Sequence, residues 1–235
     1  MPAPVSRGPM GPGELVRRQQ LLRHRASTEF EWVVGDTDDG PFTVESLEDE
    51  ERCIPGMLRA AVAAECQGCA GIILGCYADP GLARVRAMLR IPVVGPAESS
   101  LQLASALGKS CGILTISDAV IPLIQKVVKT TGLEDCIAGI RTTGTTVLHV
   151  ADDREAMLQR LAKAGEIALT EDGADVLVLG CMSLAFLNAA PELSRRLDAP
   201  VVCPLTAAIS SAEAIVRAHV NSRSLIRSEA ISAAS

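Results

Sequence analysis

Two cysteines stand in nearly the same short setting in distant parts of the chain. Leu-Gly-Cys ends the apolar run AGIILGC at Cys76, and it returns after ADVLV at Cys181. A continuous apolar run of this length is typical of a strand that is buried on both faces in a parallel sheet. Each cysteine therefore follows a buried strand at its carboxyl end, where ligands bind in open α/β sheets.

A cysteine in this position can act as an acid or as a base. Each one precedes a loop and a helix N-terminus, where backbone N–H groups and the helix dipole favour anions and lower the pKa of a thiol. A thiolate can remove a proton from one face of a substrate carbon while a thiol returns a proton to the opposite face. The pair Cys76 and Cys181 predicts inversion at a carbon without a cofactor, with N–H groups stabilising the developing enolate.

Several neighbours of the cysteines are candidates for substrate binding. Gly75 and Gly180 permit a tight turn and a close approach of the backbone. Glu98 and Thr206 occupy matching places after two PVV-x-P segments, where they either orient the substrate or stabilise the first turn of a helix. The remaining candidates could bind substrate or serve as packing and capping residues: Tyr77, Thr115, Ser117, Met182 and Ser183.

The other six cysteines are expected to be packing residues, because cysteine is among the most buried residue types. Cys66 and Cys69 form a CxxC, but no second CxxC follows, so no metal site and no redox site is predicted. The other four are Cys53, Cys111, Cys136 and Cys203.

Strands and helices are expected to alternate along the chain. Apolar runs predict strands within residues 70–76, 91–95, 111–117, 135–143, 174–181 and 199–204, with helical patterns between them. Strands that alternate with helices indicate an α/β fold with parallel sheets.

Three local patterns lead to further expectations. The segment TEFEWVV (28–34) places Phe30, Trp32 and Val34 on one side, which predicts a strand with one buried face. A helix that begins near residue 45 is expected to break near Pro55. Asp79 is expected to cap the helix that follows it in the chain.

The chain also contains an internal repeat. LGCYADPGLARVRAMLRIPVVGPAESSLQLASA and LGCMSLAFLNAAPELSRRLDAPVVCPLTAAISSA both give a strand end, a cysteine, a loop, a helix, PVV-x-P and an alanine-rich helix. Two copies of one unit predict two similar lobes related by a pseudo-twofold axis. Each lobe would present its cysteine to a cleft between them.

Composition argues against several classes of protein. Of the 235 residues 48% are hydrophobic, only 2% are aromatic, and the net charge is −6 without a basic stripe. Binding to nucleic acid or to a membrane is therefore not expected. No window predicts a membrane span or a secretory signal, so the eight cysteines are expected to be reduced thiols in a cytoplasmic protein.

The segments around the cysteines resemble the aspartate/glutamate/hydantoin racemase superfamily. The resemblance covers residues 40–218 and is carried by GCYADPGL, PVVGPAESSLQLAS, ILTISDAVIP, GIRTTGTTVL and VLVLGCMSLA. The Asp-Pro-Gly after the first cysteine is similar to the hydantoin and allantoin racemase branch. The amino-acid racemase branch more often has Asn or Thr directly after that cysteine, where this chain has Tyr77.

This resemblance implies that Cys76 and Cys181 are the acid/base pair of two flavodoxin-like lobes. Residues 1–107 with 205–235 would form the first lobe, and residues 108–204 the second. The family usually begins with an apolar strand and an Asn-Pro-Asn-type loop that touches the substrate, whereas this chain begins MPAPVSRGPMGP. Either the recorded start lies too far downstream, or RGPMGP is used differently.

Together these observations predict a cofactor-independent racemase of a 5-substituted hydantoin or an allantoin-like cyclic ureide. The alternatives are an aspartate/glutamate-type amino-acid racemase, a decarboxylase or isomerase of a small diacid, and a non-catalytic binding lobe. The expected partners are a small-molecule substrate and, because apolar helices recur in both lobes, further copies of the chain. The ring substituent and the preferred enantiomer stay open.

Overall fold

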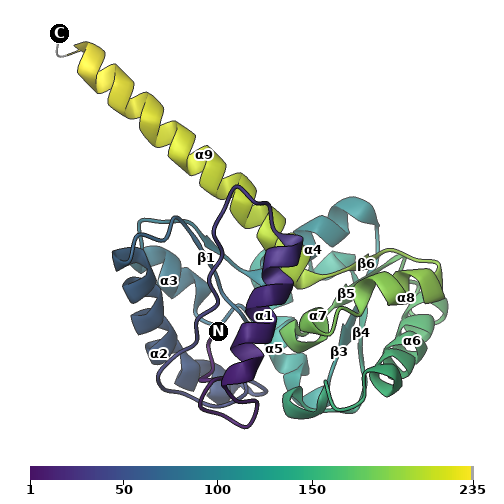
Figure 1. Cartoon of the computed structure of the whole chain (residues 1–235). Helices are drawn as coiled ribbons and strands as arrows, with labels where there is room; N and C mark the ends of the chain where they lie inside the picture. The colour runs from purple at the N-terminus through teal and green to yellow at the C-terminus, as the bar shows by residue number, and fades with distance from the viewer. Residues whose placement is uncertain (234–235) are drawn as a thin grey trace.

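Two parallel sheets hold the strands of the molecule. The computed structural model describes residues 1–233, with side chains up to residue 220. The first sheet pairs β1 with β2, and the second has the order β4-β3-β5-β6, all parallel. The strands are β1 Ile72–Ile73, β2 Val93–Val94, β3 Cys111–Thr115, β4 Ile137–Thr142, β5 Val176–Leu179 and β6 Val201–Val202. The predicted α/β class with parallel sheets is confirmed, and the sheets form two lobes (Figure 1).

Helices follow the strands and cover the sheets. They are α1 Pro12–Arg25, α2 Leu47–Cys66, α3 Leu82–Met88, α4 Pro96–Leu107, α5 Ile121–Thr131, α6 Arg154–Thr170, α7 Met182–Phe186, α8 Ala190–Leu197 and α9 Pro204–Ala233. Helix α9 packs on α4 and on both strands of the first sheet, so the end of the chain returns to its first half. The predicted lobe boundaries at residues 107 and 204 stay a prediction.

The second sheet forms the larger core. Every residue of β3 and of β5 is buried, which is why both strands are continuous apolar runs in the sequence. Helix α6 packs on β3, β4 and β5 with buried side chains that include Leu158 and Leu161. This core fixes the end of β5, from which Cys181 continues.

The first sheet is smaller, and the strand predicted for residues 28–34 is absent. Residues 28–30 form a turn and a bend, and residues 31–34 are irregular and pair with no strand. The side chain of Gln19 in α1 takes the place of a partner strand, since its amide donates to the Trp32 carbonyl and its Oε1 accepts the Val34 N–H at 2.6 Å. The alternating pattern therefore reflects a half-buried side, with Phe30, Trp32 and Val34, of an irregular segment.

Two expectations about helix boundaries are also wrong. Pro55 lies inside α2 without ending it, because an apolar face that includes Cys53, Ile54 and Met57 holds the helix against the core. Asp79 does not cap the next helix in the chain, which begins after Gly81. Its carboxylate instead accepts the Ala97 and Glu98 N–H groups, at 3.1 and 2.9 Å, and so caps α4.

Candidate active site

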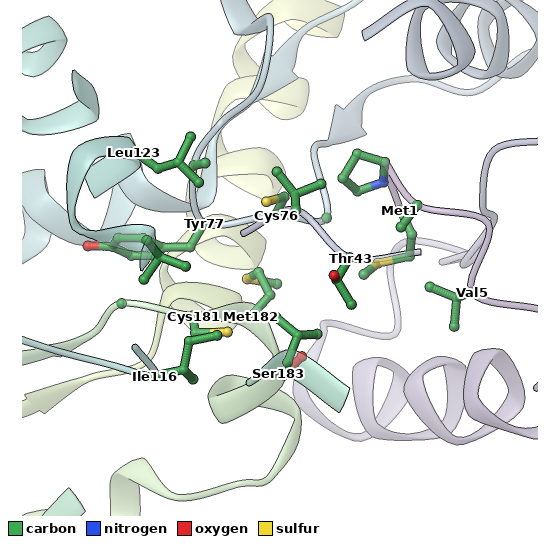
Figure 2. A pocket seen from close by; sticks show the side chains of 18 of the residues that line it. Met1, Val5, Thr43, Cys76, Tyr77, Ile116, Leu123, Cys181, Met182 and Ser183 are labelled. Atoms are coloured by element: carbon green, nitrogen blue, oxygen red, sulfur yellow. The ribbon is translucent and has the colours of Figure 1, made fainter. Parts of the chain in front are cut away.

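One pocket collects the loops that follow β1 and β5. It encloses about 650 Å³, including its open mouth. Figure 2 shows Cys76 and Cys181 entering it from loops on two sides. The predicted site residues that line it are Gly75, Cys76, Tyr77, Thr115, Gly180, Cys181, Met182 and Ser183. The two cysteines, which are far apart in the chain, therefore share one cavity.

Three predicted site residues lie outside this pocket. Glu98 forms an ion pair with Arg86 at 2.5 Å on the side of α4. Thr206 is exposed and lines a separate groove beside α8. The Ser117 Oγ is buried and has no hydrogen-bond partner among the described residues.

The Cys181 loop is attached to the end of β3. The Thr115 hydroxyl donates to the Gly180 carbonyl at 3.0 Å, and the Gly180 N–H donates to the Leu114 carbonyl at 2.7 Å. A Cβ at position 180 would lie 2.7 Å from Cγ2 of Ile113, so only glycine permits this approach. For Thr115, a candidate for either substrate binding or capping, the structure shows a hydroxyl contact that positions the Cys181 loop, and substrate binding stays a prediction.

The Cys76 loop is attached differently, through Asp79. The Asp79 N–H donates to the Cys76 carbonyl at 3.2 Å, while its carboxylate caps α4. Asp79 has a φ of 46°, in the left-handed region that aspartate tolerates better than most residues. Burial raises the pKa of this carboxyl to about 7.

Both catalytic candidates have raised pKa values, contrary to the expectation from the adjoining backbone N–H groups. Burial raises the pKa of Cys76 and of Cys181 and outweighs the groups that act in the other direction. Near Cys76 the main opposing group is the Ala78 N–H. Near Cys181 the N–H groups of Ser183 and Leu184, the Ser183 hydroxyl and a guanidinium all favour the thiolate. The second thiol is therefore the better placed to ionise.

That guanidinium belongs to Arg18, which the sequence reasoning missed. Arg18 is 2% exposed and lines the pocket from α1, which lies over the junction of the lobes in Figure 1. In the sequence it is one of several basic residues in the segment VRRQQLLRHR, with nothing there to single it out. Further lining residues that were missed come from the first ten residues and the loop before α2, among them Met1, Val5 and Thr43 (Figure 2).

The described side chains contain no group of three or more His, Cys, Asp or Glu residues that could hold a metal ion. In the same part of the chain no helix combines the length and the apolar character that a membrane span requires.

The family model, the curated relatives and the solved structures similar to this chain include racemases in each case. The family model for Asp/Glu/Hydantoin racemase matches residues 17–212. A hydantoin racemase of Pseudomonas sp. (strain NS671) is 34% identical over 84% of this chain and 79% of its own length. A hydantoin racemase of Rhizobium meliloti is 32% identical over 77% of this chain and 74% of its own length. The crystal structure of allantoin racemase from Pseudomonas fluorescens superposes with a TM-score of 0.81 at 28% identity, covering 88% of this chain and 86% of that one. The chain belongs to the Asp/Glu/hydantoin racemase family.

Proposed function

We propose that the protein is a cofactor-independent racemase of 5-substituted hydantoins or allantoin-like cyclic ureides. The main support is that Cys76 and Cys181, from loops of two different sheets, line one pocket. Its relatives named hydantoin racemase and the similar structure named allantoin racemase support the substrate class. Both kinds of ring carry an acidic C–H beside a carbonyl.

The proposed reaction is a proton transfer through two sulfur atoms. A thiolate takes the proton from the ring stereocentre, and the electron pair of the broken C–H bond moves onto the adjacent carbonyl oxygen as an enolate. The thiol of the other cysteine then donates its proton to the opposite face of the same carbon, which inverts the centre. One S–H bond forms and one breaks, so the two cysteines exchange protonation states. The rate should show a bell-shaped pH dependence that belongs to the coupled pair.

The lining of the pocket supports a ureide over a free amino acid. Apolar side chains such as Ile116 and Leu123 form most of the wall, and Arg18 is the one charged side chain among the described lining residues. A free aspartate or glutamate would bring an ammonium group, and no carboxylate lines this pocket to receive it. A neutral ring with an apolar substituent has no such requirement.

Proton NMR in D₂O with an enantiopure 5-substituted hydantoin tests the proposal. In the wild type, deuterium should enter at the stereocentre as optical purity is lost, faster than in a sample without protein. Cys76→Ser and Cys181→Ser should each lower the rate of racemisation at least about 100-fold, because each removes one proton-transfer group. Cys66→Ser is the matched control, since Cys66 is exposed and lies outside the pocket.

Two results would contradict the proposal. Racemisation at the wild-type rate in either single variant would exclude a mechanism that needs both sulfur atoms. Activity on aspartate or glutamate, without activity on hydantoins or allantoin, would replace the substrate class and leave the two-cysteine chemistry in place.

A further inference from the structure

Arg18 is a buried cation at the pocket, and it takes no part in the proposed proton transfer. Its Nε donates to Oε1 of Glu14 at 2.7 Å. The hydrogen bonds of its two terminal nitrogens go to thioether sulfurs, Met1 Sδ at 3.7 Å and Met10 Sδ at 3.6 Å. Thioethers are weak acceptors. Among the described residues, the terminal nitrogens of this guanidinium therefore have no anionic partner.

Glu14 does not neutralise the positive charge at this position. The same carboxylate also binds Arg17, whose Nε lies 2.7 Å from Oε2 and whose Nη2 lies 2.8 Å from Oε1. Two guanidinium groups thus share one carboxylate, which leaves one net positive charge. Arg17 is half-exposed, whereas Arg18 faces the pocket. The unbalanced charge at the pocket is that of Arg18.

The guanidinium is fixed against the element that follows Cys181. Its Cζ lies 4.6 Å from the centroid of the Phe186 ring, which belongs to α7. Helix α7 begins directly after Cys181. Two contacts thus hold the Arg18 guanidinium: Nε donates to Glu14, and the face of the group stacks on the Phe186 ring.

We propose that Arg18 is a positioning residue that holds Cys181 as the thiolate of the resting enzyme and so leaves Cys76 as the thiol. This inference rests on the proposed two-cysteine function and assigns the two roles within it. A buried cation stabilises a nearby anion more strongly than an exposed one, because water does not screen it. The reaction carries a single negative charge, which Arg18 would balance.

The charged groups around the two thiols also favour a thiolate at Cys181 over one at Cys76. Arg18 favours the thiolate of Cys181. Near Cys76, an ionised Asp79 carboxyl and a thiolate at Cys181 both disfavour a second thiolate. The Met1 amino group also lies near Cys76 and Arg18, and near Asp36, and burial lowers its pKa to about 6, so it is mainly neutral at pH 7. The arrangement therefore makes Cys181 the base and Cys76 the acid.

The test is the pH dependence of alkylation by iodoacetamide, read at Cys181 by peptide mass spectrometry in a Cys76→Ser background. This measurement needs no turnover, and its midpoint reports the pKa while its plateau reports access. Arg18→Met should raise the midpoint by at least about one unit, which is a tenfold loss of thiolate at lower pH. Arg23→Met is the matched control, because Arg23 is an exposed cation of the same helix that does not line the pocket. The midpoint of this control should stay within about 0.3 unit, or twofold.

An unchanged midpoint in a folded Arg18→Met variant would overturn the proposal. If that variant does not fold, a second comparison with Arg18 intact decides. Cys181 in the Cys76→Ser protein must titrate at lower pH than Cys76 in the Cys181→Ser protein, and the reverse order would overturn the assignment. Because alkylation is independent of substrate, failure of the racemase assay with a shifted midpoint would reject the function and retain the Arg18–Cys181 coupling.

Discussion

The two cysteine loops have similar sequences but different surroundings. Strand β5 lies inside the four-stranded sheet, and α7 begins directly after Cys181. Strand β1 has two residues in a two-stranded sheet, and the chain makes a left-handed turn at Asp79 before α3 begins at Leu82. A repeated motif has thus been placed on two unequal supports.

The third residue after each cysteine shows the consequence of this difference. After Cys76 it is Asp79, a buried carboxyl that caps α4, and after Cys181 it is Leu184, a fully buried apolar side chain. Together with Arg18, this places an acidic group near one thiol and a positive charge near the other. One site obtains both an acid and a base when the surroundings of two titratable groups give them different pKa values. The comparison teaches that sequence symmetry in the motif does not require equal roles.

The largest expected effect separates the two single-cysteine variants. With each enantiomer tested alone in D₂O at pH 7, Cys76→Ser should still exchange the stereocentre proton of one enantiomer, without inversion, through the Cys181 thiolate. Cys181→Ser retains the cysteine that is mainly a thiol, so its exchange with either enantiomer should be at least about tenfold slower. Equal exchange rates in the two variants, measured by proton NMR, would show that the two loops are equivalent.

A smaller effect is expected from removing the anchor of the Cys76 loop. Asp79→Ala leaves the buried N–H of Ala97 and the N–H of Glu98 without their acceptor, so the free energy of unfolding should fall by about 1–3 kcal/mol. Urea denaturation at pH 6 measures this change. Glu98→Ala removes a partly exposed acid from the same helix turn and should cost less than about 1 kcal/mol. A similar loss in both variants would mean that Asp79 acts only as a first-turn charge.

The same anchor predicts a pH dependence of stability. Burial raises the pKa of Asp79 to about 7 in the folded protein, above its value in the unfolded chain. The folded state therefore holds this proton over a range in which the unfolded state has lost it, and stability falls as pH rises from about 4 to 7, by at most about 1.4 kcal/mol per unit. Asp79→Asn removes this titrating carboxyl. In urea titrations the free energy of unfolding of the variant, relative to the wild type, should therefore rise between pH 4 and 7. A constant difference across that range would contradict the raised pKa.

The smallest effect is expected at the residues directly after the cysteines. The Tyr77 hydroxyl points away from both cysteine sulfurs in Figure 2, and the side chain is 3% exposed. Tyr77→Phe keeps the ring, so kcat/KM for the hydantoin should change by less than about threefold. The kcat/KM of Met182→Leu should also change by less than about threefold. Steady-state polarimetry measures both. A tenfold loss in Tyr77→Phe alone would place its hydroxyl in contact with the substrate.

The amino-acid sequence by itself determined the fold class and the two cysteines. Strands such as β3 and β5 are continuous apolar runs because both of their faces are buried, and that burial is visible in a single sequence. The helices between them, and the cysteine at the end of each repeated strand, follow from local pattern alone. The repeated motif was therefore enough to predict that Cys76 and Cys181 line one pocket.

Only the tertiary structure decided the features that depend on contacts between distant residues. Gln19 satisfies the backbone of a segment that resembles a strand, Asp79 caps a helix beyond the next one in the chain, and Arg18 is buried against Phe186. Local sequence could not show these contacts, because each partner is chosen by packing and not by neighbouring position. The same holds for the two thiols, whose pKa values depend on desolvation and on charges brought from other parts of the chain.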